Sequence, residues 1–177
     1  MDSTGDRIIA AAVAEFSQHG IAGARVERIA RSARTSKERV YAYFRSKEAL
    51  YRFVAERELA AVAEATRLDP ADLPGYAGRV HDYFTAHPER FRLMRWGQLE
   101  LTPDAPNPVQ ASVTRKVEQL RAAQEAGQLD PAWDPLDVLM FVNQIAMSWA
   151  GVTPRDDAFL AARRAAVVAA VERLFPR

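Results

Sequence analysis

The stretch RVERIARSARTSKERVYAYFRSKEAL, residues 25–50, has the pattern of two short helices joined by a tight turn and followed by the start of a third. Apolar residues from Val26 to Ala33 fall at helical spacing, and the spacing breaks after Ala33. Ser36 can begin the second helix by accepting a backbone N–H as its N-cap, and Ser46 can do the same for the third. The stretch therefore predicts a helix-turn-helix.

Basic residues are concentrated in the same stretch. Residues 25–47 contain eight lysines and arginines against two acidic residues, a local net charge of +6; because the whole chain carries +1, the other residues together carry −5. Lys37 and Lys47 each occupy the first position of a predicted helix, where the helix macrodipole disfavours a cation by roughly 0.3–1 kcal/mol. An anion docked at these helix starts would remove that penalty. The charge distribution indicates a nucleic-acid-binding surface, with a merely solvated charged face as the alternative.

Composition and residue usage exclude several classes of protein. The chain has 177 residues and 49% hydrophobic content, enough for a real core and too much for a disordered protein. It has no cysteine, no metal-binding spacing among its three histidines and no glycine-rich phosphate loop, so we expect no metal, no cofactor and no enzymatic activity. The first residues lack the basic segment of a signal peptide, and no apolar run of about 18 residues could span a membrane. We therefore expect a cytoplasmic protein without membrane contact.

A further helix is expected before the helix-turn-helix. It would begin at Ser3 or the next residue, where Ser3 and Asp6 can form a variant of the capping box, and it would end at Gly20. Three helices sharing one small core are the minimum for a DNA-binding head of this kind. We predict a DNA-binding domain at residues 1–50, with its last helix continuing to about Leu68 as a connector.

Several of these residues also resemble a known family. The pair Ile29-Ala30, a tight turn, Ser36 and then VYAYFRSKEAL at 40–50 are similar to the N-terminal signature of TetR-type transcriptional repressors. The resemblance covers about residues 4–55. It implies an all-α fold of about nine helices, in which a three-helix head precedes a helical domain for ligand binding and dimerisation.

The turn departs from the family pattern. TetR-type proteins usually have Gly-Val there, and this chain has Arg34-Thr35. Arg34 would have to adopt the backbone conformation that glycine adopts easily, at a cost on the order of 1 kcal/mol. The tilt of the following helix depends on that turn.

The resemblance implies that the recognition helix spans Ser36 to Phe44. The implied DNA contacts are Arg25, Ser36, Lys37, Glu38, Arg39, Tyr41, Ala42, Tyr43 and Lys47. Of these, Arg39 can make a bidentate contact with guanine, Glu38 can accept from cytosine, and Ala42 can touch only a thymine methyl group. The two tyrosines, Lys47 and Arg25 would hold phosphates, although Tyr41 could instead be a half-buried packing residue.

Residues 69–177 are helical by pattern, and the resemblance assigns them to ligand binding and dimerisation. The last two predicted helices are rich in apolar residues and alanine, which suits a closely packed interface. In the family this helix pair forms a four-helix bundle with its copy in a two-fold dimer; completion of a monomer core is the alternative. The candidate interface residues are Leu139, Leu160, Val167, Val168, Val171, Leu174 and Phe175.

The middle of the second region combines aromatic, apolar and a few polar residues, which is typical of ligand pockets and also of helical cores. The candidates are His81, Phe84, Phe91, Met94, Trp96, Gln98, Asn143, Met147 and Trp149. Asn143 is the strongest of them, because an amide in an otherwise apolar helix needs a hydrogen-bond partner.

Together these features predict a homodimeric regulator, most often a repressor in this family, that binds double-stranded DNA. Two heads would read a palindromic operator with half-sites ~34–36 Å apart or a multiple of that distance. A small hydrophobic effector would favour a second state with wrongly spaced heads and release the DNA. A helical adaptor without DNA binding and a small all-helical enzyme are the alternatives; the charge imbalance argues against the first, and the missing catalytic groups argue against the second.

Overall fold

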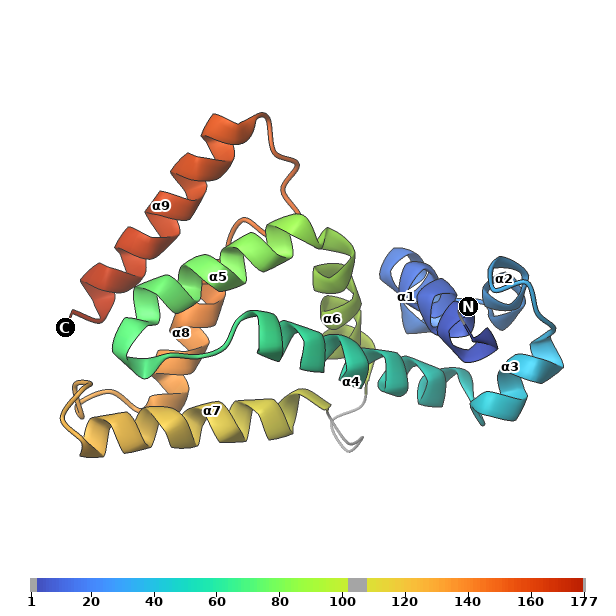
Figure 1. Ribbon diagram of the computed structural model, residues 1–177, viewed down its shortest axis with the longest axis horizontal. Helices are drawn as coiled ribbons and strands as arrows, with labels where there is room; N and C mark the ends of the chain where they lie inside the picture. Colours follow the sequence, from blue (N-terminus) through green and yellow to red (C-terminus); the bar gives the residue numbers. More distant parts are fainter. Residues whose placement is uncertain (1–2, 102–107, 177) are drawn as a thin grey trace. The chain divides into compact units, whose positions relative to one another are not determined.

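The computed structural model describes residues 3–101 and 108–176, and all regular structure in these ranges is helical (Figure 1). The elements are α1 (Thr4–Gly23), α2 (Val26–Ser32), α3 (Lys37–Tyr43), α4 (Lys47–Ala65), the 3-10 helix η1 (Pro70–Asp72), α5 (Leu73–Ala86), α6 (Pro88–Glu100), α7 (Pro108–Glu125), α8 (Pro135–Met147) and α9 (Asp157–Leu174). The nine α-helices of the described ranges confirm the predicted all-α class.

The chain divides into two compact units. The first comprises residues 1–60 and 89–108, and the second comprises 61–88 and 109–177. This division differs from the predicted boundaries in two respects. The connector helix α4 contributes to both units, and α6 belongs to the first unit, although the sequence pattern placed it in the C-terminal domain.

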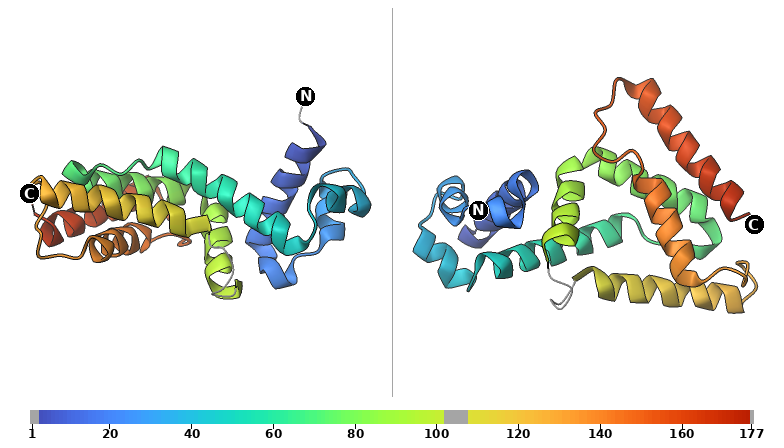
Figure 2. Two further views of the ribbon diagram at one scale, coloured as in Figure 1. Left: turned by 90° about the horizontal axis from the view of Figure 1, so that it is seen from below. Right: turned by 180° about the vertical axis from the view of Figure 1, so that it is seen from behind.

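The first unit has one hydrophobic core shared by α1, α2, α3, the first half of α4, and α6 (Figures 1 and 2). Its buried members are Ile8, Ala12, Phe16, Ile21, Ala24, Val26, Ile29, Ala30, Ala33, Val40, Leu50, Tyr51, Val54, Ala55 and Leu93. Full burial of one large apolar side chain contributes about 1.5–3 kcal/mol. This core therefore fixes the three N-terminal helices as one body.

The ends of α1 follow the predicted signals. Ser3 is the N-cap, and its Oγ accepts from the backbone N–H of Asp6, whose carboxylate accepts in return from the backbone N–H of Ser3. Gly20 has φ 70 and interrupts the helix where its end was predicted, although a last helical turn continues to Gly23.

Helix α6 is held against the first unit by hydrogen bonds to distant parts of the chain. The Glu100 carboxylate accepts from the backbone N–H groups of Ile21, at 2.6 Å, and Ala22, at 2.8 Å. Both groups lie just past the break at Gly20, at the start of the last helical turn of α1. The first N–H groups of a helical segment have no partner within that segment. Glu100 thus acts as a cap supplied from another helix.

The second unit is organised around α5, which packs against α8 and α9 (Figure 1). The buried face of α5 carries the predicted apolar stripe, including Tyr76, Val80 and Phe84. An ion pair between Arg164 and Asp82, 2.8 Å between Nε and Oδ2, joins α9 to α5 at the surface. Among the described residues, no helix is long and apolar enough to cross a membrane.

Candidate nucleic-acid interface

The turn between α2 and α3 is closed by a helix-ending motif that normally contains glycine. The backbone N–H of Thr35 donates to the carbonyl of Ala30 at 2.9 Å, and that of Arg34 donates to Arg31 at 3.1 Å. These two bonds form a Schellman motif, in which the first residue after the helix cap takes a left-handed conformation. Arg34 takes it here with φ 52, as the sequence predicted. The turn between α2 and α3 therefore closes without the usual glycine.

Helix α3 presents nearly all of its side chains to the exterior. Ser36 caps it by accepting from the backbone N–H of Arg39 at 3.2 Å. Val40, 1% exposed, is the single buried side chain of the helix. All the other side chains of α3 are exposed, including Tyr41 at 41% and Tyr43 at 48%, so neither tyrosine is a core residue. The predicted base-facing residues lie together on the outward surface of one short helix.

Two predicted anion contacts have partners inside the first unit. The Lys37 ammonium donates to Glu27 of α2, and this bond raises the pKa of Lys37 and lowers the pKa of Glu27. The Lys47 ammonium donates to the carbonyls of Ala22, at 3.1 Å, and Ala24, at 3.3 Å. These oxygens give both cations a partner in the DNA-free chain, and the contact of Lys37 and Lys47 with a docked anion stays a prediction.

Glu15 is a structural residue of the interface that the sequence reasoning missed. Its carboxylate is 9% exposed and accepts from the backbone N–H of Arg25 at 2.8 Å, and it pairs with the guanidinium of Arg28 at 2.6 Å. Burial would raise the pKa of Glu15, but the bonds from Arg28 and Arg25 outweigh burial and lower it. Glu15 thereby fixes the start of α2, where the exposed Arg25 side chain was predicted to hold a phosphate.

The predicted ligand-pocket residues are divided between the two units. Phe91, Met94, Trp96 and Gln98 belong to the first, and His81, Phe84, Asn143, Met147 and Trp149 belong to the second. Neither unit alone contains the predicted set. Within the first unit, the Trp96 indole donates to the carbonyl of Ser17 at 3.3 Å, which gives Trp96 a structural partner.

Inside the second unit, three polar side chains from three helices form a chain of hydrogen bonds. The Lys116 ammonium donates to the Tyr76 hydroxyl at 2.9 Å, and that hydroxyl donates to Oδ1 of Asn143 at 3.0 Å. Burial raises the pKa of Tyr76 to about 12 and lowers the pKa of Lys116. Asn143 thus has the partner that its position required, and Lys116 was missed because a lysine on a helix is usually exposed.

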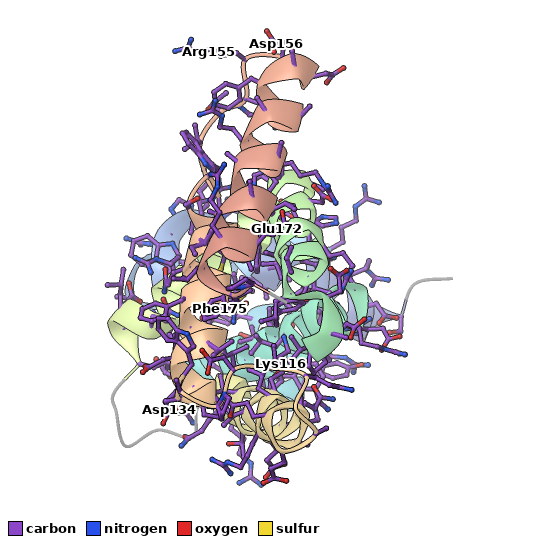
Figure 3. All side chains as sticks on the ribbon, turned by 90° about the vertical axis from the view of Figure 1, so that its left-hand side faces the viewer. Lys116, Asp134, Arg155, Asp156, Glu172 and Phe175 are labelled. Carbon is purple, nitrogen blue, oxygen red and sulfur yellow. The ribbon has the colours of Figure 1, made fainter. Side chains whose placement is uncertain are left out.

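Four of the seven predicted dimer residues are buried within their own chain. Leu139, Val167, Val171 and Phe175 are at most 9% exposed in the single chain, so their apolar surface is already used in the core of the second unit. Figure 3 shows Phe175 at the C-terminal end of α9. Leu160, Val168 and Leu174 are half-buried and retain some surface. The exposed large apolar side chains of α8 are instead Leu136, Met140 and Phe141.

Comparisons with known proteins cover both units. A family model described as bacterial regulatory proteins, tetR family, matches residues 8–54, and one described as tetracyclin repressor-like, C-terminal domain, matches residues 72–173. The HTH-type transcriptional repressor SCO4008 of Streptomyces coelicolor is 40% identical over 157 residues, which are 87% of this chain and 81% of that protein. The HTH-type transcriptional repressor NicS of Pseudomonas putida is 41% identical over 96 residues, 50% of this chain and 45% of NicS.

A solved structure agrees over the whole length. The crystal structure of the transcriptional regulator SCO4942 from Streptomyces coelicolor has a TM-score of 0.87 and 59% identity, and the match covers 99% of both chains. The helix-turn-helix geometry, the two family models and these relatives agree, and the chain belongs to the TetR family of transcriptional regulators.

Proposed function

We propose that this regulator represses transcription by binding a palindromic operator as a homodimer, and that a small apolar ligand releases it. The observation that carries the DNA-binding part is α3, which has one buried anchor, Val40, and an exposed surface of basic, acidic and aromatic side chains. A helix of this kind can enter the major groove and read base edges.

The proposed contacts follow from chemistry and position. Arg39 and Glu38 are exposed, and they carry the donors and acceptors that distinguish guanine and cytosine. Tyr41 and Tyr43 would hold phosphates through their hydroxyl groups. Lys37 would have to exchange its bond to Glu27 for a DNA contact, which makes it a weaker candidate than Arg39.

Dimerisation would use the surface that the second unit leaves exposed. Leu136 and Met140 lie one turn apart on α8 and are 44% and 42% exposed, and Phe141 beside them is 43% exposed. The alanines on the exposed side of α9 would allow a partner helix to approach closely. A pair of chains is also what a palindrome requires, because each head then reads one half-site.

Selection from a random duplex library with the purified protein tests this proposal. We expect one palindrome to be enriched. Arg39→Ala should relax one base pair in each half-site, at a cost of about 1–3 kcal/mol, whereas Tyr43→Ala should weaken all sequences alike. Arg67→Ala is the matched control, since Arg67 is an exposed cation of the second unit, 78% exposed and paired with Glu64.

Three outcomes would contradict parts of the proposal. No enrichment at moderate salt would contradict DNA recognition by the free protein, and a non-palindromic consensus would contradict the two-fold dimer. Loss of binding with the Arg67→Ala control would mean that binding follows total charge and not α3. Release by a ligand is tested separately, by adding small-molecule extracts to the protein–operator complex and following fluorescence anisotropy.

A further inference from the structure

Three helices of the second unit each contribute one polar side chain to a single chain of hydrogen bonds, and α5 also buries His81. On α7 the buried Leu120 and Ala123 mark the inner face, and Lys116 lies on the same face one turn before Leu120. Tyr76 lies on the buried face of α5, and Asn143 lies beside the buried residues of α8. The side chains of Lys116, Tyr76 and Asn143 come together at one place in the second unit.

Their geometry leaves hydrogen-bonding capacity unused. Lys116 lies on the side of α7 that faces α5 (Figure 3), with its ammonium 2.9 Å from the Tyr76 hydroxyl and 5.1 Å from the centre of the Tyr76 ring. An ammonium has three donors, and the hydroxyl accepts one of them. The Asn143 amide accepts from Tyr76 through Oδ1, and in the described part of the chain its NH₂ group has no acceptor.

The charge on Lys116 has no counter-ion within the described residues. No carboxylate of those residues lies within 4.0 Å of the ammonium, and the charged side chain that affects it is the cation Arg115. Tyr76 is neutral, since burial raises its pKa to about 12. A partly buried cation without an anion opposes folding, and an apolar side chain of similar length would not. This cost suggests a functional role for the lysine.

We propose that the effector of this regulator carries one carboxylate, which pairs with the ammonium of Lys116 and with the amide of Asn143, and an apolar body. The inference rests on the proposed function, because it assigns the chemistry of the ligand that releases the DNA. The single ammonium within hydrogen-bond distance of the Tyr76 hydroxyl balances one negative charge, which is the charge of one carboxylate. Buried apolar residues stand near the polar groups in their own helices, Leu120 of α7 and Val142 of α8, so the remainder of the ligand would be apolar.

Direct binding to the DNA-free full-length protein tests the site. The probes are hexanoate, decanoate and benzoate, each with the neutral alcohol of the same skeleton, and binding is measured by titration calorimetry and by the shift in melting temperature. We expect at least one carboxylate to bind the wild type well above its alcohol. Lys116→Met should weaken that carboxylate about tenfold or more and leave the alcohol unchanged. Arg121→Met, which removes an exposed cation from the same helix, should change neither.

The unliganded variants provide a second readout. If Lys116 serves a ligand, Lys116→Met should be at least as stable to urea as the wild type, because the variant no longer holds a partly buried cation without a counter-ion. A marked loss of stability in both Lys116→Met and Lys116→Gln would assign Lys116 a structural role and overturn the proposal. Equal binding of carboxylates and alcohols, or no binding of any carboxylate, would also overturn it.

These results separate this inference from the proposed function. A carboxylate that binds through Lys116 but does not release the operator would support the anion site and contradict ligand-controlled release by that site. Release by a neutral ligand that is equally effective on Lys116→Met would support the proposed function and overturn the carboxylate assignment.

Discussion

Replacing Gly97 of α6 by alanine should destabilise the first unit through one side chain, Tyr51. A Cβ at position 97 would lie inside contact distance of the Tyr51 hydroxyl, and 3.2 Å from Cζ of the same ring. The ring has little room to move, because Tyr51 is 1% exposed and its edge-to-face contact with Phe16 has centroids 5.3 Å apart. Its hydroxyl also donates to the carbonyl of Leu93 at 2.7 Å.

The size of the effect follows from three contributions. Forcing a methyl group into a packed core costs about 1–3 kcal/mol. Displacing the Tyr51 hydroxyl from the Leu93 carbonyl costs about 0.5–1.5 kcal/mol more. Alanine is the better helix former and returns about 1 kcal/mol of this loss. The net destabilisation should therefore be on the order of 1–3 kcal/mol, which for a chain of this size lowers the melting temperature by about 2–4 °C per kcal/mol.

Urea unfolding of a double-mutant cycle is the assay. Tyr51→Phe alone should cost about 0.5–1.5 kcal/mol, because it removes one buried hydrogen bond. In the double variant the alanine methyl occupies the space of the missing hydroxyl, so the two changes together should cost at least about 1 kcal/mol less than their sum. Gly5→Ala is the control, since its Cβ would meet its nearest neighbour, Ser3 Oγ, at an ordinary 3.5 Å. Additive effects of Gly97→Ala and Tyr51→Phe would refute the steric reasoning.

Three further predictions concern stability. Arg34→Gly should stabilise the protein by about 1 kcal/mol in urea, because it removes the strain at φ 52, whereas Arg34→Ala keeps the strain and should not stabilise. Glu15→Gln should cost about 1–3 kcal/mol near neutral pH. The native pKa of Glu15 lies below the ordinary 4.5, so its contribution is complete above pH 4.5 and lost as pH falls through the native pKa; an acid titration should show the loss in the wild type and not in Glu15→Gln. The pKa of Tyr51 and that of Tyr76 are raised from 10 to about 12. The free energy of unfolding in urea should therefore be unchanged by these groups below pH 10 and should decline between pH 10 and pH 12. The decline should be less steep in Tyr51→Phe.

The helix-turn-helix could be predicted because its determinants are local. The N-cap Ser36 and the helix that it begins are adjacent in the sequence, and the capping box of Ser3 and Asp6 spans three residues. The left-handed Arg34 was predicted from the family resemblance, because glycine usually occupies that position of the turn. Such features need no knowledge of the rest of the fold.

The hydrogen bonds that hold α6 against α1 and α4 could not be predicted, because they join residues that are distant in the chain. Glu100 caps the broken end of α1 from 79 residues away, and Tyr51 reaches the Leu93 carbonyl across 42 residues. In the sequence, Glu100 is one more acidic residue at the end of a helix. Its role depends on α6 packing within the first unit, and helical periodicity contains no information about which helix packs against which.

Apolar periodicity shows that a helix face is covered, but it does not show by which chain. The cover can be the same chain or a second one. Val167 and Val171 of α9 are covered by their own chain, whereas Leu136 of α8 is 44% exposed although it is equally apolar. A polar interruption is more informative, because burying a charge opposes folding unless something compensates it. Within the described residues Lys116 has a neutral partner, Tyr76, and no counter-ion, and an anionic ligand would supply one.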